Sequence, residues 1–517
     1  MLRPVVLIQA LLALAIGPAG TALAQAAHDH GEGAHGEVGR VRFPTRCAKA
    51  AQPPLERGIA LLHSFWYEAA ETAFQEAARA DGLCPFAYWG LAMSRLYPLW
   101  TPPTPDDSRA GLIAAQRAVG LSRPESRERD YASAIVRFFQ VFERQGFRTG
   151  IFAWESTMAV VQARNPADDE ARIFHGLALI AAGQLDPSDT TYHRQREAAS
   201  QLDALISRYP DHPGLTHYLI HAFDSPALAH LARGAADHYA AIAPDVPHAL
   251  HMPSHIYVRL GLWREAIVSN QRSAEAGRRA EESAGWHGVW GQRIHAWDYL
   301  VYASLQVGEE QLAREIVDEA AGVTVVIPAN DLISDYALAA IPARYALERE
   351  DWAGATRLEV RHAPAWPATE ALTRFARAIG ASRSGDTALA QREIDTLVTL
   401  EASLRRASGP QLYWADQVRI QRLAATGWLD RVRGDTADAL QSSGEAADLE
   451  DRTEKHPVTP GALLPARELY ADLLLSLDRP EEALANYRAS EARQPNRART
   501  RRGIERALAA ITARTME

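Results

Sequence analysis

The chain has 517 residues, of which 47% are apolar, and a formal net charge of −9. This length exceeds one ordinary domain, and the apolar content is that of a folded protein rather than a disordered one. The modest acidic charge gives no reason to expect nucleic acid as a partner, because nucleic-acid-binding proteins usually present a basic face. The two lysines, Lys49 and Lys455, lie in no Gly-Lys-Ser/Thr triplet, which excludes a phosphate-binding P-loop.

Residues 1–24 predict a secretory signal peptide. Arg3 is followed by an apolar run and then by the small-x-small site Ala22-Leu23-Ala24. A retained N-terminal anchor is the alternative, although a glycine and a proline interrupt the run. No later segment supplies about 20 consecutive apolar residues. We therefore expect a periplasmic or secreted chain that begins at Gln25 and has no membrane partner after cleavage.

Residues 25–50 predict a flexible leader rich in histidine and glycine. The stretch shows no periodicity and contains His28, His30 and His35. Histidine-rich tracts can bind metal ions, whereas a solvated linker is the simpler interpretation.

The only two cysteines, Cys47 and Cys84, flank the first strongly helical segment. An even number of thiols in an exported protein predicts a disulfide bond, because that compartment permits oxidation. Two separately packed thiols are the alternative that the sequence leaves open.

Helix pairs with a recurring spacing of small residues begin near residue 55. In "GIALLHSFWYEAAETAFQEAARA", Gly58 precedes Ala70 by twelve residues, and Phe74 lies on the same face of the second helix. Near the end of the chain, Ala471 precedes Ala483 by the same twelve. Small residues at these places let two helices approach closely, and the aromatic ring fills the gap between neighbouring pairs.

This pattern resembles the tetratricopeptide repeat, a helix–turn–helix unit of 34 residues. Weaker copies cover residues 51–517, which predicts ten or eleven helix pairs followed by a C-terminal capping helix. The resemblance implies an all-α, right-handed solenoid whose first helices line a concave groove. No β-sheet is expected because strand-type alternation is missing, and a plain helical bundle would need no 34-residue register. The wording "HYLIHAF" and "HALHMPSHIYVRLGLW" also resembles exported bacterial proteins of this repeat family.

Two histidine pairs repeat at the period of the solenoid. His217 and His221 in "HYLIHAF" precede His251 and His255 in "LHMPSHI" by 34 residues. Residues four apart share one helix face at about 6 Å, and neighbouring helices lie about 8–10 Å apart. The four imidazoles are therefore predicted to form one patch of metal ligands. Pro253 opposes this grouping, since it favours a helix start that turns His251 away.

Further polar residues at equivalent places extend the patch as predicted ligand-binding residues: His248, His295, Asp298, Tyr302 and Asp224. Crowded imidazoles stay neutral, and neutral imidazole binds zinc, copper or another divalent transition metal. A small anionic ligand or a peptide is a second interpretation. A third is that these histidines only form hydrogen bonds between packed helices.

The sequence therefore predicts an exported binding scaffold whose groove takes a protein, a peptide or a small ligand. The alternative function is a metal-binding protein, with a metalloenzyme as its catalytic form. The chain has no nucleophile elbow, no His-Glu-x-x-His and no paired-cysteine motif, so no catalytic residue is assigned and a non-enzyme is favoured.

Overall fold

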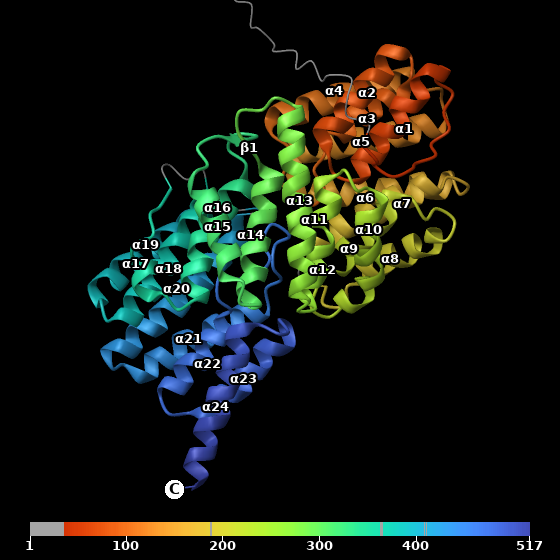
Figure 1. Cartoon of the computed structure of the whole chain (residues 1–517). Helices are drawn as coiled ribbons and strands as arrows, with labels where there is room; N and C mark the ends of the chain where they lie inside the picture. Colours follow the sequence, from red (N-terminus) through yellow and green to blue (C-terminus); the bar gives the residue numbers. More distant parts are fainter. Residues whose placement is uncertain (1–35, 187–188, 362–365, 408, 410, 517) are drawn as a thin grey trace, which may run out of the picture. The chain divides into compact units, whose positions relative to one another are not determined.

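The computed structural model describes residues 36–186, 189–361, 366–407, 409 and 411–516 (Figure 1). These residues belong to one compact unit, His35–Glu517. The predicted signal peptide and the predicted histidine-rich tract, with His28, His30 and His35, lie outside the described residues. None of the described helices is both long enough and apolar enough to span a bilayer.

The α-helices follow one another with short connections. In chain order they are α1 (Gln52–His63), α2 (Tyr67–Ala80), α3 (Pro85–Met93), α4 (Pro105–Leu121), α5 (Arg127–Gln145), α6 (Phe147–Arg164), α7 (Asp169–Gln184), α8 (His193–Ile206), α9 (Pro213–Phe223), α10 (Arg233–Ile242), α11 (Pro247–His251), α12 (Pro253–Arg259), α13 (Trp263–Ser283), α14 (Gly291–Gln306), α15 (Glu310–Ala321), α16 (Leu332–Glu348), α17 (Trp352–Thr356), α18 (Pro367–Ser384), α19 (Thr387–Ala407), α20 (Gln411–Arg433), α21 (Thr436–Asp451), α22 (Ala466–Ser476), α23 (Pro480–Arg493) and α24 (Ala498–Met516). Two short 3₁₀ turns, Lys49–Ala51 and Ala229–Ala232, accompany them.

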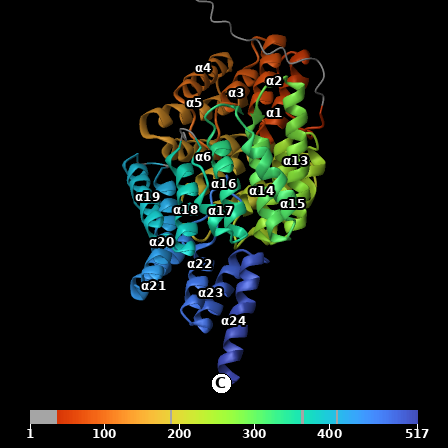
Figure 2. The same cartoon turned by 60° about the vertical axis from the view of Figure 1, so that its left-hand side comes forward.

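Consecutive helices pack as pairs, from α1 with α2 through α22 with α23, and the second helix of each pair contacts the first helix of the next. The short helices α11 and α12 together form the first helix of the pair completed by α13. The described residues thus contain eleven pairs, with α24 packed on α23 (Figures 1 and 2). The predicted all-α array of helix pairs is confirmed.

The expectation of no β-sheet is wrong at one small place. Strand β1 (Val289–Trp290) pairs in parallel with β2 (Val326–Ile327), and each strand has two residues. The extended segments that follow α13 and α15 lie side by side there, so their backbone groups satisfy one another.

A close approach of helices explains the small residues of the repeat. A Cβ atom on Gly58 of α1 would lie 2.8 Å from the Phe74 ring, and one on Gly90 of α3 would lie 2.3 Å from it. Phe74, on α2, is fully buried. The ring therefore fills the space between the first two helix pairs, as the sequence pattern predicts, and no larger residue fits at either glycine.

The turn inside each pair repeats one backbone feature. In seven pairs a residue with positive φ stands two places before the second helix: Phe65, Gly261, Gly308, Glu350, Gly385, Gly434 and Asp478. This left-handed conformation costs an L-residue about 1–2 kcal/mol and costs glycine almost nothing. Glycine at four of the seven places is therefore the local signal that ends the first helix.

Residues 36–50 differ from the flexible leader predicted for them. The Arg40 amide donates to the carbonyl of Asp211 (2.9 Å), and the Phe43 side chain is completely buried. The predicted cysteines, Cys47 and Cys84, form a disulfide with their Cα atoms 5.0 Å apart. The segment is thus attached to the first repeats by packing, by hydrogen bonds and by a covalent bond.

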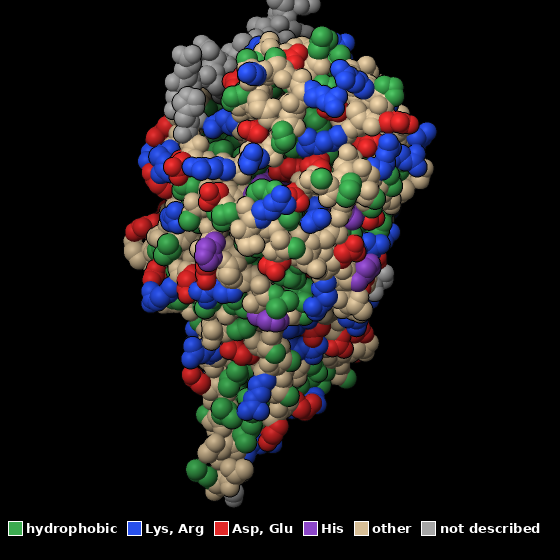
Figure 3. Space-filling model, turned by 90° about the vertical axis from the view of Figure 1, so that its right-hand side faces the viewer, with side chains coloured by type: hydrophobic (Ala, Val, Ile, Leu, Met, Phe, Trp, Pro, Cys, Tyr) green, Lys and Arg blue, Asp and Glu red, His purple; other side chains and the backbone are tan. Residues whose placement is uncertain are grey.

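Charged side chains of both signs are interspersed over the surface. On the face shown in Figure 3, lysines and arginines alternate with aspartates and glutamates. Many of these groups pair along one helix, as Arg278 does with Glu275 at 2.7 Å. Exposed pairs of this kind contribute little to stability, so the fold rests on its apolar interior.

We predict that Gly385→Ala lowers the free energy of unfolding of its repeat by about 1–2 kcal/mol. Gly385 has φ of +83°, and a Cβ atom there would meet nothing within 4 Å, so only backbone strain opposes the change. The matched control is Gly120→Ala, at an exposed helical glycine that also has open space around it. This control should be neutral or slightly stabilising. Equal urea midpoints for the two variants would contradict the assignment of the turn.

Candidate functional site

Six histidines converge from the first helices of three successive pairs. They are His217 and His221 on α9, His248 and His251 on α11, His255 on α12 and His295 on α14. The 34-residue interval does bring equivalent helix faces near one another, since the ring centroids of His221 and His255 lie 6.2 Å apart. The expectation of one four-histidine patch is wrong, because each predicted pair instead joins a further histidine, His248 or His295, in a cluster of its own. Their position differs from the open groove that the sequence led us to expect, because the most exposed of the six is only 5% exposed. The first helices are covered on both sides, and the histidines belong to the protein core.

The first cluster consists of His217, His221 and His248, whose ligand nitrogens all lie within 4.8 Å of one another. Nε2 of His217 lies 3.1 Å from Nε2 of His221 and 3.1 Å from Nε2 of His248. Nδ1 of His217 donates to the backbone carbonyl of His63 (2.6 Å), so its Nε2 carries a lone pair. That lone pair faces two other nitrogens, and only one of them can donate a proton to it at a time.

The second cluster consists of His251, His255 and His295, with the same 4.8 Å limit between ligand nitrogens. Nδ1 of His251 lies 2.6 Å from Oδ1 of Asn270. The amide orientation of Asn270 is fixed, because its Nδ2 donates to the carbonyl of Ala266 (2.8 Å). Nδ1 of His251 must therefore be the donor, and its Nε2 is left with a lone pair.

The same constraint acts on the neighbouring ring. Nδ1 of His255 donates to Oδ2 of Asp224 (2.9 Å), and Asp224 also accepts from Lys455 (3.0 Å) and Arg259 (2.9 Å). Burial alone would raise the pKa of Asp224, but these two cations outweigh it and hold that pKa well below its usual value. The carboxylate can only accept, so Nε2 of His255 also carries a lone pair. It lies 3.0 Å from Nε2 of His251, lone pair against lone pair.

The helix break at Pro253 does not separate His251 from His255. Pro253 begins α12 as predicted, but Met252 before it keeps helical dihedral angles (φ −54°, ψ −36°). The chain therefore continues in nearly the same direction from α11 to α12. The expectation that Pro253 turns His251 away is wrong.

Burial keeps the imidazoles neutral. It lowers the pKa of His217 to about 3 and holds the pKa of His221, His248, His251 and His295 well below the usual value. Neighbouring imidazoles lower these pKa values further, since like charges in a low-dielectric interior repel. For His255, burial also lowers the pKa, while the Asp224 carboxylate opposes the shift.

Aromatic rings enclose the first cluster. The ring of Phe65 lies 4.5 Å from the ring of His217, and the ring of Trp100 lies 5.2 Å from that of His248, measured between centroids. Tyr239 stacks on His217 at 5.1 Å. These rings exclude bulk water from the nitrogens.

Two predicted ligand-binding residues belong elsewhere. Asp298 pairs with Arg344 (3.0 Å), and both side chains are completely buried. Tyr302 accepts from Arg497 (2.7 Å) and donates to Gln494 (3.2 Å). Both lie further along α14 than His295, by about one and two helical turns, where they contact α16 and the residues that precede α24. They hold helices together and do not join the histidine clusters.

A third buried group shows what a satisfied arrangement looks like. Glu170 accepts from Nε2 of His63 (3.0 Å) and from Nε2 of His212 (2.8 Å). Burial alone would raise the pKa of Glu170, but the two imidazoles outweigh it and lower that pKa. Each Nε2 here donates to a carboxylate, so this group needs no added cation. Through its own backbone carbonyl, His63 also holds the ring of His217.

Sequence reasoning missed the residues that position the clusters. Asn270, Lys455, Arg259 and Tyr299 hold or contact histidines, and Lys455 comes from the non-helical segment between α21 and α22. The hydroxyl of Tyr299 lies 3.4 Å from Nε2 of His255 and donates to the carbonyl of Thr459 (3.1 Å). Of these four residues, only Asn270 could have been found from the sequence. It is a polar residue at a repeat position that is expected to be buried on the second helix of its pair.

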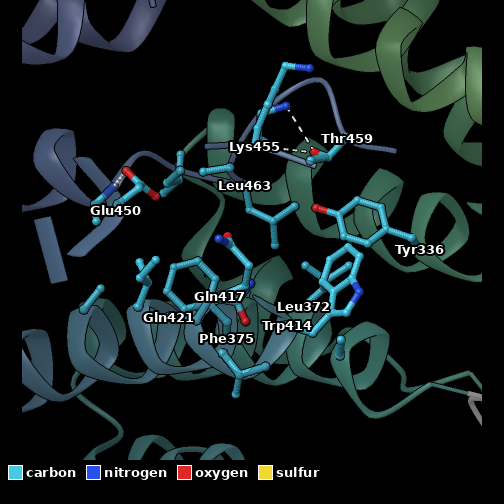
Figure 4. Close-up of a pocket in the computed structure, with 18 of the residues that line it drawn as sticks. Tyr336, Leu372, Phe375, Trp414, Gln417, Gln421, Glu450, Lys455, Thr459 and Leu463 are labelled. Carbon is cyan, nitrogen blue, oxygen red and sulfur yellow. Dashed lines mark hydrogen bonds between the residues drawn. The ribbon is translucent and has the colours of Figure 1, made fainter. Parts of the chain in front are cut away.

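A small enclosed cavity lies on the other side of the same non-helical segment (Figure 4). Its volume is about 50 Å³, which is room for a few water molecules. Tyr336, Trp414 and Phe375 form apolar walls, while Gln421 and Glu450 contribute polar groups. Oε1 of Gln421 is buried and has no hydrogen-bond partner among the residues described.

No protein-family model matches the sequence, and no curated protein matches it. Solved structures with a similar fold include the Cut9–Hcn1 hetero-tetramer of the APC/C (13% identity, TM-score 0.36), covering 90% of this chain and 78% of that chain. The Rap protein complexed with Competence and Sporulation Factor (14%, TM-score 0.40) covers 78% of this chain and 99% of that one. For the P58(IPK) TPR domain the identity is 14% and the TM-score 0.20, and the match covers 90% of this chain and 99% of that domain. These neighbours are proteins of helical repeats, and the assignment of the helix pairs rests on this chain's own packing.

We predict that Glu450→Gln stabilises the protein at pH 8 and has little effect at pH 5. Burial raises the pKa of Glu450 to about 7 from its usual 4.5. The backbone amide of Ala466 donates to the carboxylate (2.7 Å) and offsets part of this rise. The folded state therefore holds a proton between these two values, and stability falls as pH rises through about 7. Because the side chain is partly exposed, we expect a gain of about 1–2 kcal/mol at pH 8. Thermal unfolding at both pH values measures it, and a gain that is equal at the two pH values would contradict it.

Proposed function

We propose that this protein binds transition-metal ions between its buried histidines, with one ion at each three-histidine cluster. The observation that carries the proposal is the contact between Nε2 of His251 and Nε2 of His255 at 3.0 Å. Each ring carries its N–H proton at Nδ1 and donates it in a hydrogen bond there. The Nε2 lone pairs of the two rings therefore point at each other. A cation between them and His295 turns this repulsion into coordination.

A proton is the weaker candidate for that cation. A shared proton would make one imidazole cationic, and burial lowers the pKa of both His251 and His255. A metal ion instead requires the neutral form of the ring, which this core favours. An ion about 2.0–2.1 Å from each nitrogen separates the nitrogens by about 3.3–3.5 Å. The observed 3.0–3.1 Å contacts therefore need to open by only a few tenths of an ångström.

The donor set selects the metal. Three neutral imidazoles suit zinc or copper, whereas magnesium and calcium prefer oxygen ligands. Hydrogen bonds at the second ring nitrogen, from His217 to a carbonyl, from His251 to an amide and from His255 to a carboxylate, are the outer contacts that orient metal ligands. Three ligands leave a fourth position open, which is the arrangement of catalytic rather than structural zinc sites.

Export remains part of the proposal. The signal-peptide pattern of residues 1–24 supports a periplasmic or secreted location, and the Cys47–Cys84 disulfide agrees with an oxidising compartment. A metal-binding function there would rely on ions available outside the cytoplasm.

The sequence also predicted a scaffold that holds a protein or peptide in a concave groove. The residues on which that prediction rested do not line a groove. The histidines expected to line that groove are buried in the core. An extended ligand cannot contact side chains that are 0–5% exposed without opening the helix pairs. Protein binding elsewhere on the array is compatible with metal binding, but these residues do not support it.

We predict two tightly bound zinc or copper ions per chain after a chelator-stripped sample is reloaded and desalted. The experiment uses the full chain with His28, His30 and His35 replaced by Ala, so that no ion binds to the leader. Replacing His251 and His255 with Ala should remove one ion, because the second cluster then keeps only His295 while the first keeps its three ligands. Replacing His217 and His221 should remove the other. Elemental analysis gives the stoichiometry, and X-ray absorption should report imidazole nitrogen as the protein donor.

The matched control is His175→Ala, a buried histidine on α7 that bonds to Gln162 and lies outside both clusters. It should retain two ions. The proposal fails if the stripped protein takes up no ion, or if the cluster variants keep the same stoichiometry as the control.

We predict that Asp224→Asn weakens the second site by about 10–100-fold while the first site changes little. The amide can still accept from His255, but it loses the charge that fixes the donor role of Nδ1. The removal also leaves Lys455 and Arg259 without their carboxylate, so melting temperatures must be compared in parallel. Competition with a zinc-sensitive dye measures the affinity of each site, and equal losses at both sites would indicate general unfolding instead.

A further inference from the structure

A concave groove of about 390 Å³ lies far from the histidines along the chain, between α18, α20, α22 and α24. Its volume falls in the range of small-molecule sites, about 300–1,000 Å³. Arg383 of α18, Arg431 of α20 and Arg506 of α24 line it, together with Asp472 of α22. The groove is therefore rich in guanidinium groups.

Arg383 is held in place without an anionic partner. Its guanidinium lies 4.3 Å from the centroid of the Trp428 ring and 4.6 Å from that of Trp352. Within the described part of the chain, its N–H groups make no hydrogen bond and no ion pair. Stacking fixes the plane of the group and leaves its edge free to donate. A partly buried guanidinium in this state is prepared for an acceptor that the chain does not supply.

The acidic residue of the groove is already committed. Asp472 accepts from Arg506 (3.0 Å), from Arg499 and from the hydroxyl of Tyr487. Arg431 donates to the backbone carbonyl of Ser476 (3.0 Å). Arg383 thus keeps N–H groups that no carboxylate of the groove accepts from, although the charge of Asp472 lies close enough to interact with it.

Two residues that line the groove each carry a buried donor without a partner. Oγ of Ser382 and Nε1 of Trp428 are both buried and make no hydrogen bond among the described residues. Their side chains are 1% and 5% exposed. Both donor atoms are covered by protein, so they lie beside the groove and do not face it. Charge and stacking at Arg383 therefore indicate the kind of group that fits.

We propose that this groove binds an organic oxyanion, a carboxylate or phosphate group, with Arg383 as its main contact. Guanidinium groups recognise both through two parallel hydrogen bonds. The ring faces of Trp352 and Trp428 keep Arg383 in one plane, and Arg431, which also lines the groove, adds positive charge. This site is independent of the proposed metal clusters, so neither proposal depends on the other.

Calorimetric titration at low ionic strength with two probes, inorganic phosphate and succinate, tests the site. We expect saturable binding with one ion per chain and an affinity that falls as NaCl is added. Arg383→Met should weaken binding at least tenfold. Arg383→Lys should also weaken it, because an ammonium keeps the charge but neither stacks in a plane nor donates two parallel bonds.

The matched control is Arg419→Met, an exposed arginine on the same helix as Trp428, and it should leave binding unchanged. Melting curves establish that all three variants fold. Tighter binding of one probe identifies the group as phosphate or as carboxylate. The proposal is overturned if neither probe binds saturably, or if Arg383→Met and Arg419→Met bind alike.

Discussion

Two hydrogen bonds on the far side of the imidazole rings determine the chemistry of the core of this protein. The amide oxygen of Asn270 accepts a hydrogen bond from Nδ1 of His251, and the carboxylate of Asp224 accepts one from Nδ1 of His255. Each bond fixes a tautomer, and the two tautomers together leave facing lone pairs at Nε2. The rest of the site follows from this constraint, since burial prevents the simplest remedy, which is to protonate a ring. A buried contact of this kind is costly in an isolated protein and favourable around a cation.

The third buried group makes the contrast clear. His63, His212 and Glu170 use the same kinds of side chain at similar burial, yet both Nε2 atoms donate to the carboxylate. That arrangement is self-sufficient and serves to join α1, α7 and α9. The difference between a packing group and a metal site therefore lies in where the protons are, and a count of histidines does not reveal it. It also explains why packing, a metal site and an organic or peptide ligand site all stayed open at the level of sequence.

Much of the fold could be predicted because the repeat leaves marks at fixed intervals. Gly58 and Phe74 fit one another across α1 and α2, and left-handed turn residues such as Gly385 recur two places before the second helix. The same register correctly placed His221 near His255, with their ring centroids 6.2 Å apart. It failed on exposure, because a period says which residues share a face and does not say what later covers that face. Pro253 also misled, since helical angles at Met252 carry the chain past it.

The residues that decide protonation could not be predicted, because contact between them depends on the path of the whole array. Lys455 reaches Asp224 across 231 positions of sequence, and it comes from a connection rather than a helix. Together with Arg259, this lysine keeps the carboxylate ionised, which keeps the proton on Nδ1 of His255 and the lone pair on Nε2. The non-helical connection between α21 and α22 therefore acts on His255 of α12 from outside the cluster. A substitution in this connection changes the charge around Asp224 without changing any of the histidine ligands. The ability of the core to hold a cation therefore depends on a segment that the repeat pattern does not describe.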